Sequence, residues 1–254
     1  MKGFYAFTKK ELLEQMRTYK WLIILSICFI FGMLSPLTAK LLPDMLKGMK
    51  IEGMEIVIPE PTMMDAYGQF FKNFSQMGIL AVLLVFGGSL SNELVKGTLV
   101  NILAKGLPRH TVILSKYFAA VILWSVGFFL AVVTMYGYTV YLFENAWADN
   151  LIFSMFCLWL FGCFVLALIF LSSTLAAGNF GGLILSAAAL VGMLMLGIFP
   201  NTEKYNPITL ASKNMALLSG AQDARGMLVT VLITCIVTAA SIIVSILLFA
   251  KKKL

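Results

Sequence analysis

Six long apolar runs, separated by polar segments, constrain the fold of this chain more than any other feature. Hydrophobic residues make up 60% of the sequence and charged residues 12%, whereas soluble domains carry roughly 25% charged residues. A helix of about 20 apolar residues is long enough to cross the hydrocarbon core of a bilayer. The sequence therefore predicts an all-α membrane protein with six transmembrane helices, at about residues 21–42, 77–90, 112–143, 151–171, 183–199 and 227–250.

Basic residues are distributed unevenly between the two sides that six spans would create. Twelve of the 19 lysines and arginines lie in the first 20 residues, in the middle segment up to Lys116 and in the C-terminal tail. Cytoplasmic segments of membrane proteins are enriched in these residues. We therefore expect both termini and the 91–111 loop to be cytoplasmic, with a small external cap at 43–76 and an external loop at 200–226. Orientation also accounts for the net charge of +7, so we expect the lipid bilayer and no nucleic acid as a partner.

Residues 1–20 predict an amphipathic helix ahead of the six-helix domain at 21–254. Thr8 and Glu11 fit a capping box, which would start a helix near Lys9. Apolar and charged side chains would then occupy different faces, as in helices that lie in the headgroup plane. A cluster of charges that only sets the orientation of the chain is the alternative interpretation. The residues that would form this elbow helix include Lys10, Glu11, Leu12, Met16 and Arg17.

Several motifs that would give the chain a chemistry of its own are missing from the sequence. It contains no G-x-x-x-x-G-K-[ST] segment to hold ATP phosphates, and its single histidine, His110, cannot supply a nucleophile–base pair within the membrane. The four cysteines lie in apolar runs without a C-x-x-C pair, so neither a disulfide nor a metal site is expected. The predicted spans contain almost no ionisable residue of the kind that ion-coupled carriers use. We expect no enzymatic activity, and any uphill transport would need energy from another subunit.

The polar segment between the second and third runs carries a recognisable series of residues. They are Glu93, Lys96-Gly97-Thr98-Leu99, Ile102-Leu103-Ala104, Pro108 with Arg109 directly after it, and then Ile113, Leu114, Ser115 and Lys116. This series resembles the pattern of the ABC-2 family permeases of ATP-binding-cassette exporters, which is a glutamate, Lys-Gly-Thr-Leu, a short apolar stretch, Pro-x-Arg and an apolar start to the third span. The Pro-Arg pair is one residue tighter than the commonest form. The N-terminal Lys10-Glu11-Leu12 segment and Tyr205-Asn206-Pro207 are similar to other parts of the family.

The resemblance implies a permease that binds a separate cytoplasmic ATPase through a short coupling helix. Gly97 and Pro108 would bracket this helix over residues 98–105, and the elbow helix would pack beside it. Its apolar residues would be buried by the ATPase and its basic residues would surround them, a common arrangement in compact interfaces. The apolar group is Leu99, Ile102 and Leu103, and the basic group is Lys96, Lys105 and Arg109.

The same resemblance implies an assembly of two permease copies and two ATPases in a bacterial plasma membrane. A homodimer is expected, with a heterodimer as the alternative, and this chain would bind no cofactor because ATP and Mg²⁺ belong to the ATPase. The second and fifth spans would line the path between the halves, with Phe86, Met193 and Met195 as candidate wall residues. The expected function is export of a hydrophobic or amphipathic compound, such as a peptide or antimicrobial. A membrane sensor or anchor, and a channel, are the alternatives.

Overall fold

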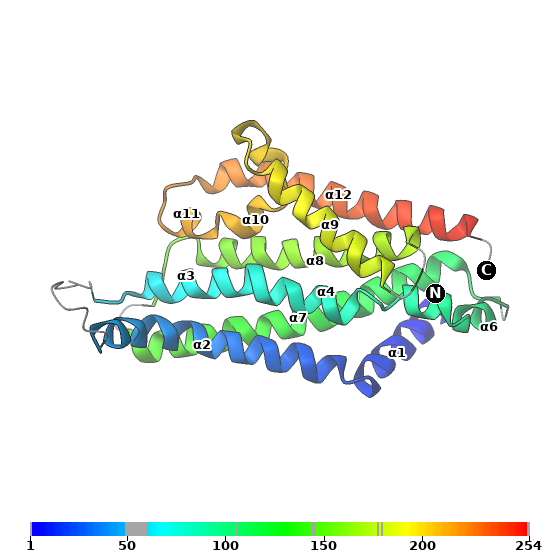
Figure 1. The fold of residues 1–254 in the computed structure, drawn as a ribbon, viewed down its shortest axis with the longest axis horizontal. Helices are drawn as coiled ribbons and strands as arrows, with labels where there is room; N and C mark the ends of the chain where they lie inside the picture. The colour runs from blue at the N-terminus through cyan, green and yellow to red at the C-terminus, as the bar shows by residue number, and fades with distance from the viewer. Residues whose placement is uncertain are drawn as a thin grey trace.

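The computed structural model describes residues 2–48, 60–104, 106–143, 146–176, 178 and 180–252. In this part of the chain all regular structure is helical, and the helices form an elongated bundle (Figure 1). Five helical segments are long and apolar enough to cross a membrane. They are Lys20–Pro43 within α2 (Lys20–Gly48), Met63–Val95, α7 (Arg109–Leu142), α8 (Leu151–Leu175) and α12 (Ala224–Lys251).

The segment Met63–Val95 combines several helical pieces that follow one another in nearly continuous order. α3 (Met63–Asn73) passes through a π-helical segment, Phe74–Gly78, into α4 (Ile79–Phe86), and a short turn leads to α5 (Ser91–Val95). α3 begins at a capping box, in which the backbone N–H of Thr62 donates to Asp65 Oδ2 at 2.8 Å. The predicted span 77–90 lies inside this longer segment, whose outer part is also helical.

α8 lies at the centre of the bundle and is the most deeply buried of the long helices. It packs against α4, α7, α12 and α9 (Gly181–Leu196). Because lipid tails are as apolar as leucine, helices in membranes associate through close packing at small residues rather than through the hydrophobic effect. Gly162 illustrates this: a Cβ atom placed there would lie 2.2 Å from the ring of Trp124 on α7.

The fifth predicted span differs from the structure in length. α9 has 16 residues, which corresponds to a rise of about 24 Å against about 30 Å of bilayer hydrocarbon. It ends before Gly197, and a 3₁₀ helix, Pro200–Tyr205, follows. In the described residues five helices, and not six, therefore meet the length expected of a span, with α9 as a shorter apolar helix.

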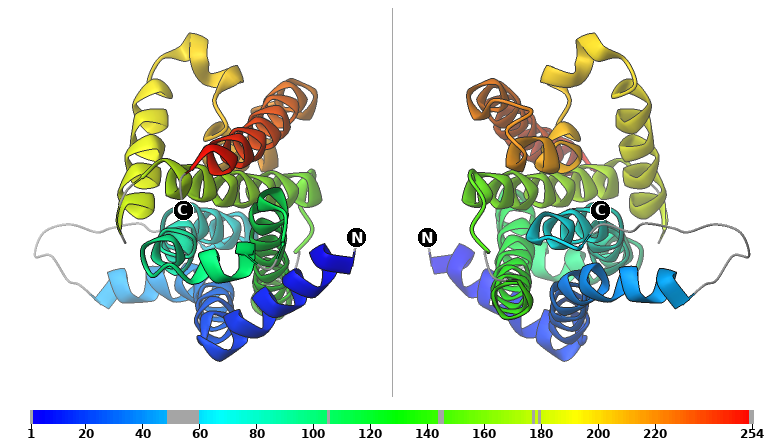
Figure 2. Two further views of the ribbon diagram at one scale, coloured as in Figure 1. Left: turned by 90° about the vertical axis from the view of Figure 1, so that its right-hand side faces the viewer. Right: turned by 90° about the vertical axis from the view of Figure 1, so that its left-hand side faces the viewer.

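Both termini lie at the same end of the bundle as α1 (Lys2–Arg17) and α6 (Thr98–Ala104), as Figures 1 and 2 show. The short helix α11 (Asn214–Leu218) lies toward the opposite end, and α10 (Thr209–Ser212) lies between it and the middle of the bundle. Residues 49–59 of the predicted external cap, and Lys105 of the predicted coupling helix, lie outside the described residues. We call the end that carries α1, α6 and the termini the terminal end.

Candidate functional site

A sharp turn between α1 and α2 directs α1 across the terminal end of the bundle. Tyr19 adopts a left-handed conformation with φ of 59°, and Thr18 Oγ1 donates to the carbonyl oxygen of Glu14 at 2.7 Å. The turn lets one face of α1 pack against α7. Phe7, Glu11 and Gln15 on this face, four residues apart, are buried.

A buried cluster of charged side chains joins α1 to α5 and α7. Nζ of Lys116, on α7, donates to Oε2 of Glu11 at 2.8 Å and to Oε1 of Glu93, on α5, at 2.6 Å. The exposed fractions of the three side chains are 1% for Lys116, 5% for Glu11 and 17% for Glu93. A buried ammonium group is tolerated only when opposite charges and hydrogen bonds compensate it. One lysine thus connects three helical elements, and we refer to Glu11, Glu93 and Lys116 as the ion cluster.

A second, more exposed ion pair flanks the ion cluster on α1. Lys10 Nζ lies 3.1 Å from Glu11 Oε1 and also pairs with Glu14 one turn further on. Burial alone would lower the pKa of Lys10, but its hydrogen bonds to the two glutamates and their charges outweigh this effect and raise its pKa to about 12. For Glu14, burial acts to raise the pKa, yet Lys10 holds it below the usual value. Both groups are therefore charged at neutral pH.

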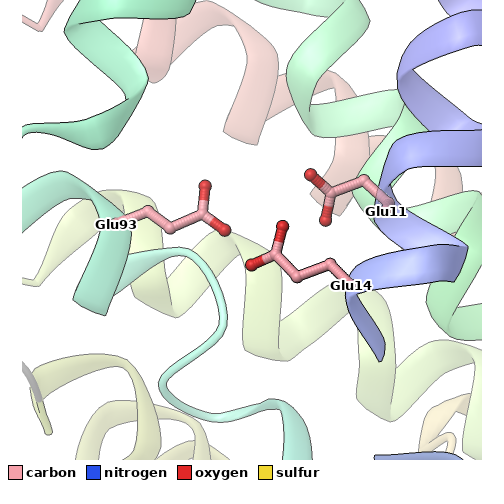
Figure 3. A group of neighbouring side chains, drawn as sticks. All are labelled: Glu11, Glu14 and Glu93. Atoms are coloured by element: carbon pink, nitrogen blue, oxygen red, sulfur yellow. The ribbon is translucent and has the colours of Figure 1, made fainter. Parts of the chain in front are cut away.

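Glu11, Glu14 and Glu93 point toward one another from α1 and α5 (Figure 3). Their nearest carboxylate oxygens lie within 4.8 Å of one another, a spacing that could accept a metal ion. However, the ammonium groups of Lys116 and Lys10 already contact these carboxylates. The cluster therefore suits an ion-pair network better than a cation site, because a further cation would have to displace the lysines.

A cavity of about 580 Å³ lies beside the ion cluster. Its walls come from α1, from the start of α2 and from the segment between α4 and α6, and they include Lys20, Ser89 and Lys96. Lys20 Nζ donates to Ser89 Oγ at 3.3 Å and lies 5.4 Å from the centre of the Phe86 ring. The terminal end is thus polar where three helices converge.

A short helix, α6, lies where the sequence predicts the coupling helix. Gly97 before it and Gly106 after it both have positive φ, 66° and 88°, a conformation that glycine adopts without strain. Pro108 is the N-cap residue of α7. The prediction of a short helix following Gly97 is confirmed.

The positions of several predicted coupling residues differ from the sequence-based expectation. Leu99 is fully buried in the core of this chain and is not free to insert into a partner, and Leu103 is half-buried against the same core. Lys96, Thr98 and Ala104 are exposed. The side chain of Ile102 and residue Lys105 lie outside the described structure.

Arg109 was expected at the rim of an interface, but it contacts the C-terminal end of α12. Its Nη1 donates to the backbone carbonyl oxygens of Phe249, Ala250 and Lys252 at 3.2, 2.9 and 2.7 Å. The last carbonyls of a helix lack intrahelical donors, and a cation also complements the negative end of the helix dipole. Arg109 therefore caps α12 and attaches it to the start of α7.

The remaining elbow-helix residues lie on different faces of α1. Leu12 is half-buried, whereas Met16 and Arg17 are exposed. Sequence reasoning included Lys116 in the motif at the end of the polar segment but assigned it no role. Its position inside the predicted span 112–143 was the available signal, because ionisable residues within spans are rare and usually paired.

The candidate path residues are not brought together around an opening. Phe86 is buried with 1% of its surface exposed, Met193 is half-buried and Met195 is 64% exposed on α9. A groove of about 620 Å³ instead lies between the α3–α4 segment and α9, toward the end opposite α1. Its wall includes Phe71, Leu80, Leu83, Leu190, Val191 and Leu194 on the apolar side, and Lys72, Ser75, Gln76 and Asn214 on the polar side.

Asn214 gives the groove an unusual polar group. Its side chain is 1% exposed, and its Nδ2 donates to the Ala211 carbonyl oxygen at 3.1 Å. Its Oδ1 has no hydrogen-bond partner among the described residues. Buried polar atoms are normally satisfied, so this oxygen is an unpaired acceptor in the wall of the groove.

Comparisons with known proteins agree with the membrane character of the chain. No family model matches the sequence. The chain is similar to the uncharacterized transmembrane protein YxlG of Bacillus subtilis (strain 168), with 26% identity over 251 residues, or 94% of this chain and 95% of that protein. Together with the five long apolar helices, this likeness identifies the chain as a multi-pass membrane protein.

Proposed function

We propose that this chain is the membrane subunit of an ABC-2-type exporter and that a separate ATPase binds at its terminal end. The ATPase would hold ATP and Mg²⁺, and this chain would catalyse no chemical step. α9 would count as a sixth, shorter membrane segment, so that both termini lie on the same side of the membrane. We assign this side, which carries the terminal end, as cytoplasmic. The excess of lysine and arginine at that end supports this orientation.

The observation that carries the proposal is the position of α6 between two glycine turns and next to α5. Two glycines with positive φ separate α6 from α5 and α7, while the ion pair of Glu93 with Lys116 attaches α5 to α7, and Lys116 in turn pairs with Glu11 on α1. A short helix between two glycine turns, next to a firmly anchored element, is suited to receive a force and pass it on. α1 lies at the same end of the bundle as α6, and in this proposal it takes the part of the elbow helix that the resemblance implies.

The surface that would meet the ATPase is smaller than the sequence predicts. Val95 is 55% exposed, and Lys96, Thr98 and Ala104 are also exposed. Leu99 instead holds α6 onto the bundle. The exposed surface thus combines the apolar side chains of Val95 and Ala104 with Lys96 and Thr98, and this mixed composition suits the polar rim of an interface.

The groove between the α3–α4 segment and α9 is the candidate substrate surface. It joins an apolar wall within the membrane segments to a polar end at Lys72 and Asn214, which suits an amphipathic molecule. In a dimer, a second copy facing the groove would close it. The route would then use the second and fifth apolar segments, but with Leu190 and Leu194 in place of Phe86, Met193 and Met195.

Co-purification with a candidate ATPase tests the proposal. The exposed charge reversal Lys96→Glu should weaken recovery of the ATPase by at least about tenfold, because reversing a charge at an interface disrupts complementarity. Lys204→Glu, at an exposed position in the opposite loop, is the matched control and should leave recovery unchanged. ATP-dependent export by the reconstituted complex separates a transporter from a sensor or anchor. Failure of every candidate ATPase to associate would refute the exporter role.

A further inference from the structure

We propose that Lys116 is a positioning residue that holds α1, α5 and α7 together as one rigid unit at the terminal end. Lys116 contributes a single ammonium group, and each of its two carboxylate partners comes from a different helix. Its partners are 105 and 23 residues away in the sequence. In the exporter proposed above, on which this role rests for its functional meaning, this unit passes motion of α6 to the membrane helices.

The geometry indicates a buried connection between the three helices, and not a simple surface ion pair. We call this connection, made by Glu11, Glu93 and Lys116, the joint. The Lys116 side chain is 1% exposed, so its ammonium group has little access to water as an alternative partner. Moving α1 or α5 alone would separate the buried ammonium group from one of its two carboxylates, and the loss of a partner is unfavourable for a buried charge. The three helices are therefore constrained to move together.

Other contacts near the ion cluster also hold α1 against α7, but they do not replace the ion cluster. The Phe4 and Phe118 rings lie 6.0 Å apart across the α1–α7 contact, and Ser115 Oγ donates to the Phe4 carbonyl oxygen at 3.4 Å. These contacts join α1 to α7 only. Glu93 and Lys116 link α5 to both of them, beside a cavity of about 580 Å³ whose wall includes Glu93.

A distance measurement between spin labels tests the joint without any partner protein. The labels would be placed at Tyr5→Cys on α1, where the native side chain is 73% exposed, and at Lys96→Cys directly after α5, in a Cys235→Ser background. The decisive variant is the triple neutral change Glu11→Gln, Glu93→Gln and Lys116→Met. Removing all the charges of a buried cluster is often tolerated by the fold, so a change in the distance distribution would report on the joint rather than on unfolding.

The wild-type chain should give one narrow distance distribution, and the triple neutral variant a distribution at least about twofold broader. The single variant Lys116→Arg keeps the positive charge, so its distance distribution should be nearly as narrow as that of the wild-type chain. The neutral double variant Glu203→Gln and Lys213→Met removes an exposed pair on the opposite loop and should change nothing. An unchanged width in the triple variant would overturn the proposal.

A second measurement connects the joint to transport. In proteoliposomes that contain the chain and its ATPase, the triple neutral variant should still bind the ATPase but export at least about tenfold less substrate per ATP hydrolysed. Wild-type export per ATP by that variant would show that the joint does not transmit motion. Absence of ATPase binding by the wild-type chain would refute the proposed exporter, and the label distances would still decide whether Lys116 joins the three helices.

Discussion

Replacing Lys116 with methionine should destabilise the chain far more than the removal of any exposed charge. Methionine has a similar length and no charge, so the substitution leaves the carboxylates of Glu11 and Glu93 without the ammonium that contacts them at 2.8 and 2.6 Å. Removing one partner of a buried ion pair costs about 3–5 kcal/mol. Lys10 still lies 3.1 Å from Glu11 in the variant, so we expect the lower end, about 3 kcal/mol.

This free energy translates into a measurable change in thermal stability. For chains of 150–250 residues, 1 kcal/mol corresponds to roughly 2–4 °C in Tm, so the expected decrease is about 6–12 °C. The assay is heating of the purified protein in detergent, followed by size-exclusion chromatography of the fraction that stays folded. Lys213→Met is the control: it removes an ion pair whose side chains are 36% and 39% exposed. Such pairs contribute about 0–1 kcal/mol.

Two outcomes of this experiment would refute the reasoning. A decrease in Tm for Lys116→Met no larger than that for Lys213→Met would mean that the ion cluster is effectively hydrated. Equal destabilisation by Lys116→Met and by the triple neutral variant would mean that lost packing, rather than uncompensated charge, causes the effect. We expect the triple variant to recover most of the lost stability, because it leaves no charge unpaired.

Three further predictions concern packing, helix capping and pH. Gly162→Ala should lower stability by about 1–3 kcal/mol, seen as a lower Tm, because its methyl group would overlap the Trp124 ring. Arg109→Met should remove the Nη1 group, whose two hydrogens are shared among three carbonyl oxygens at the end of α12. The expected loss is about 1.5–3 kcal/mol, the value of one hydrogen bond from a charged donor, and faster hydrogen exchange in residues 246–252 would report it. The contribution of the Glu14–Lys10 pair, measured as the Tm difference between wild type and Glu14→Gln, should stay constant from about pH 5 to 10. The Glu14 pKa is lowered from 4.5, so the contribution of the pair should be lost as the pH falls through that lowered value. The Lys10 pKa is raised from 10.5, so the contribution should also be lost as the pH rises through about 12.

Controls and contrary results are available for each of these three. Gly137 is helical and has nothing within 4 Å of an added Cβ, so Gly137→Ala should be neutral or stabilising, and equal effects at Gly137 and Gly162 would contradict the packing argument. Unchanged exchange at the end of α12 in Arg109→Met would show that the cap is dispensable. A Tm difference for Glu14→Gln that grows below pH 4 would contradict the sign derived for its pKa.

Local features of the chain were predictable because they depend on short stretches of sequence. The all-helical membrane architecture follows from the length of the apolar runs, and α6 follows from a helical stretch after Gly97. The length of α9 was less predictable, since the apolar run continues through residues 197–199 although the helix ends at Leu196. Apolarity extends a predicted span, but the backbone decides where the helix stops.

The roles of individual side chains were harder to predict. Leu99 was expected to face a partner and is instead buried in the chain's own core, and Arg109 was expected at an interface and instead caps α12. Both expectations treated the 91–111 segment by itself. The residues that contact Leu99 and Arg109 come from elsewhere in the chain, and sequence spacing alone cannot bring them into view.

The sequence by itself determined that this protein spans a membrane, and that its charged residues gather in a few segments. Only the tertiary structure decided which of those charges meet, because Glu11, Glu93 and Lys116 are brought together by the turn at Tyr19 and by the packing of α1 against α7. In a membrane, lipid-facing and core-facing side chains are equally apolar, so composition cannot distinguish the packed face of a helix from the exposed one. The position of a buried lysine within such a bundle depends on helix packing, which the pattern along the chain does not encode locally.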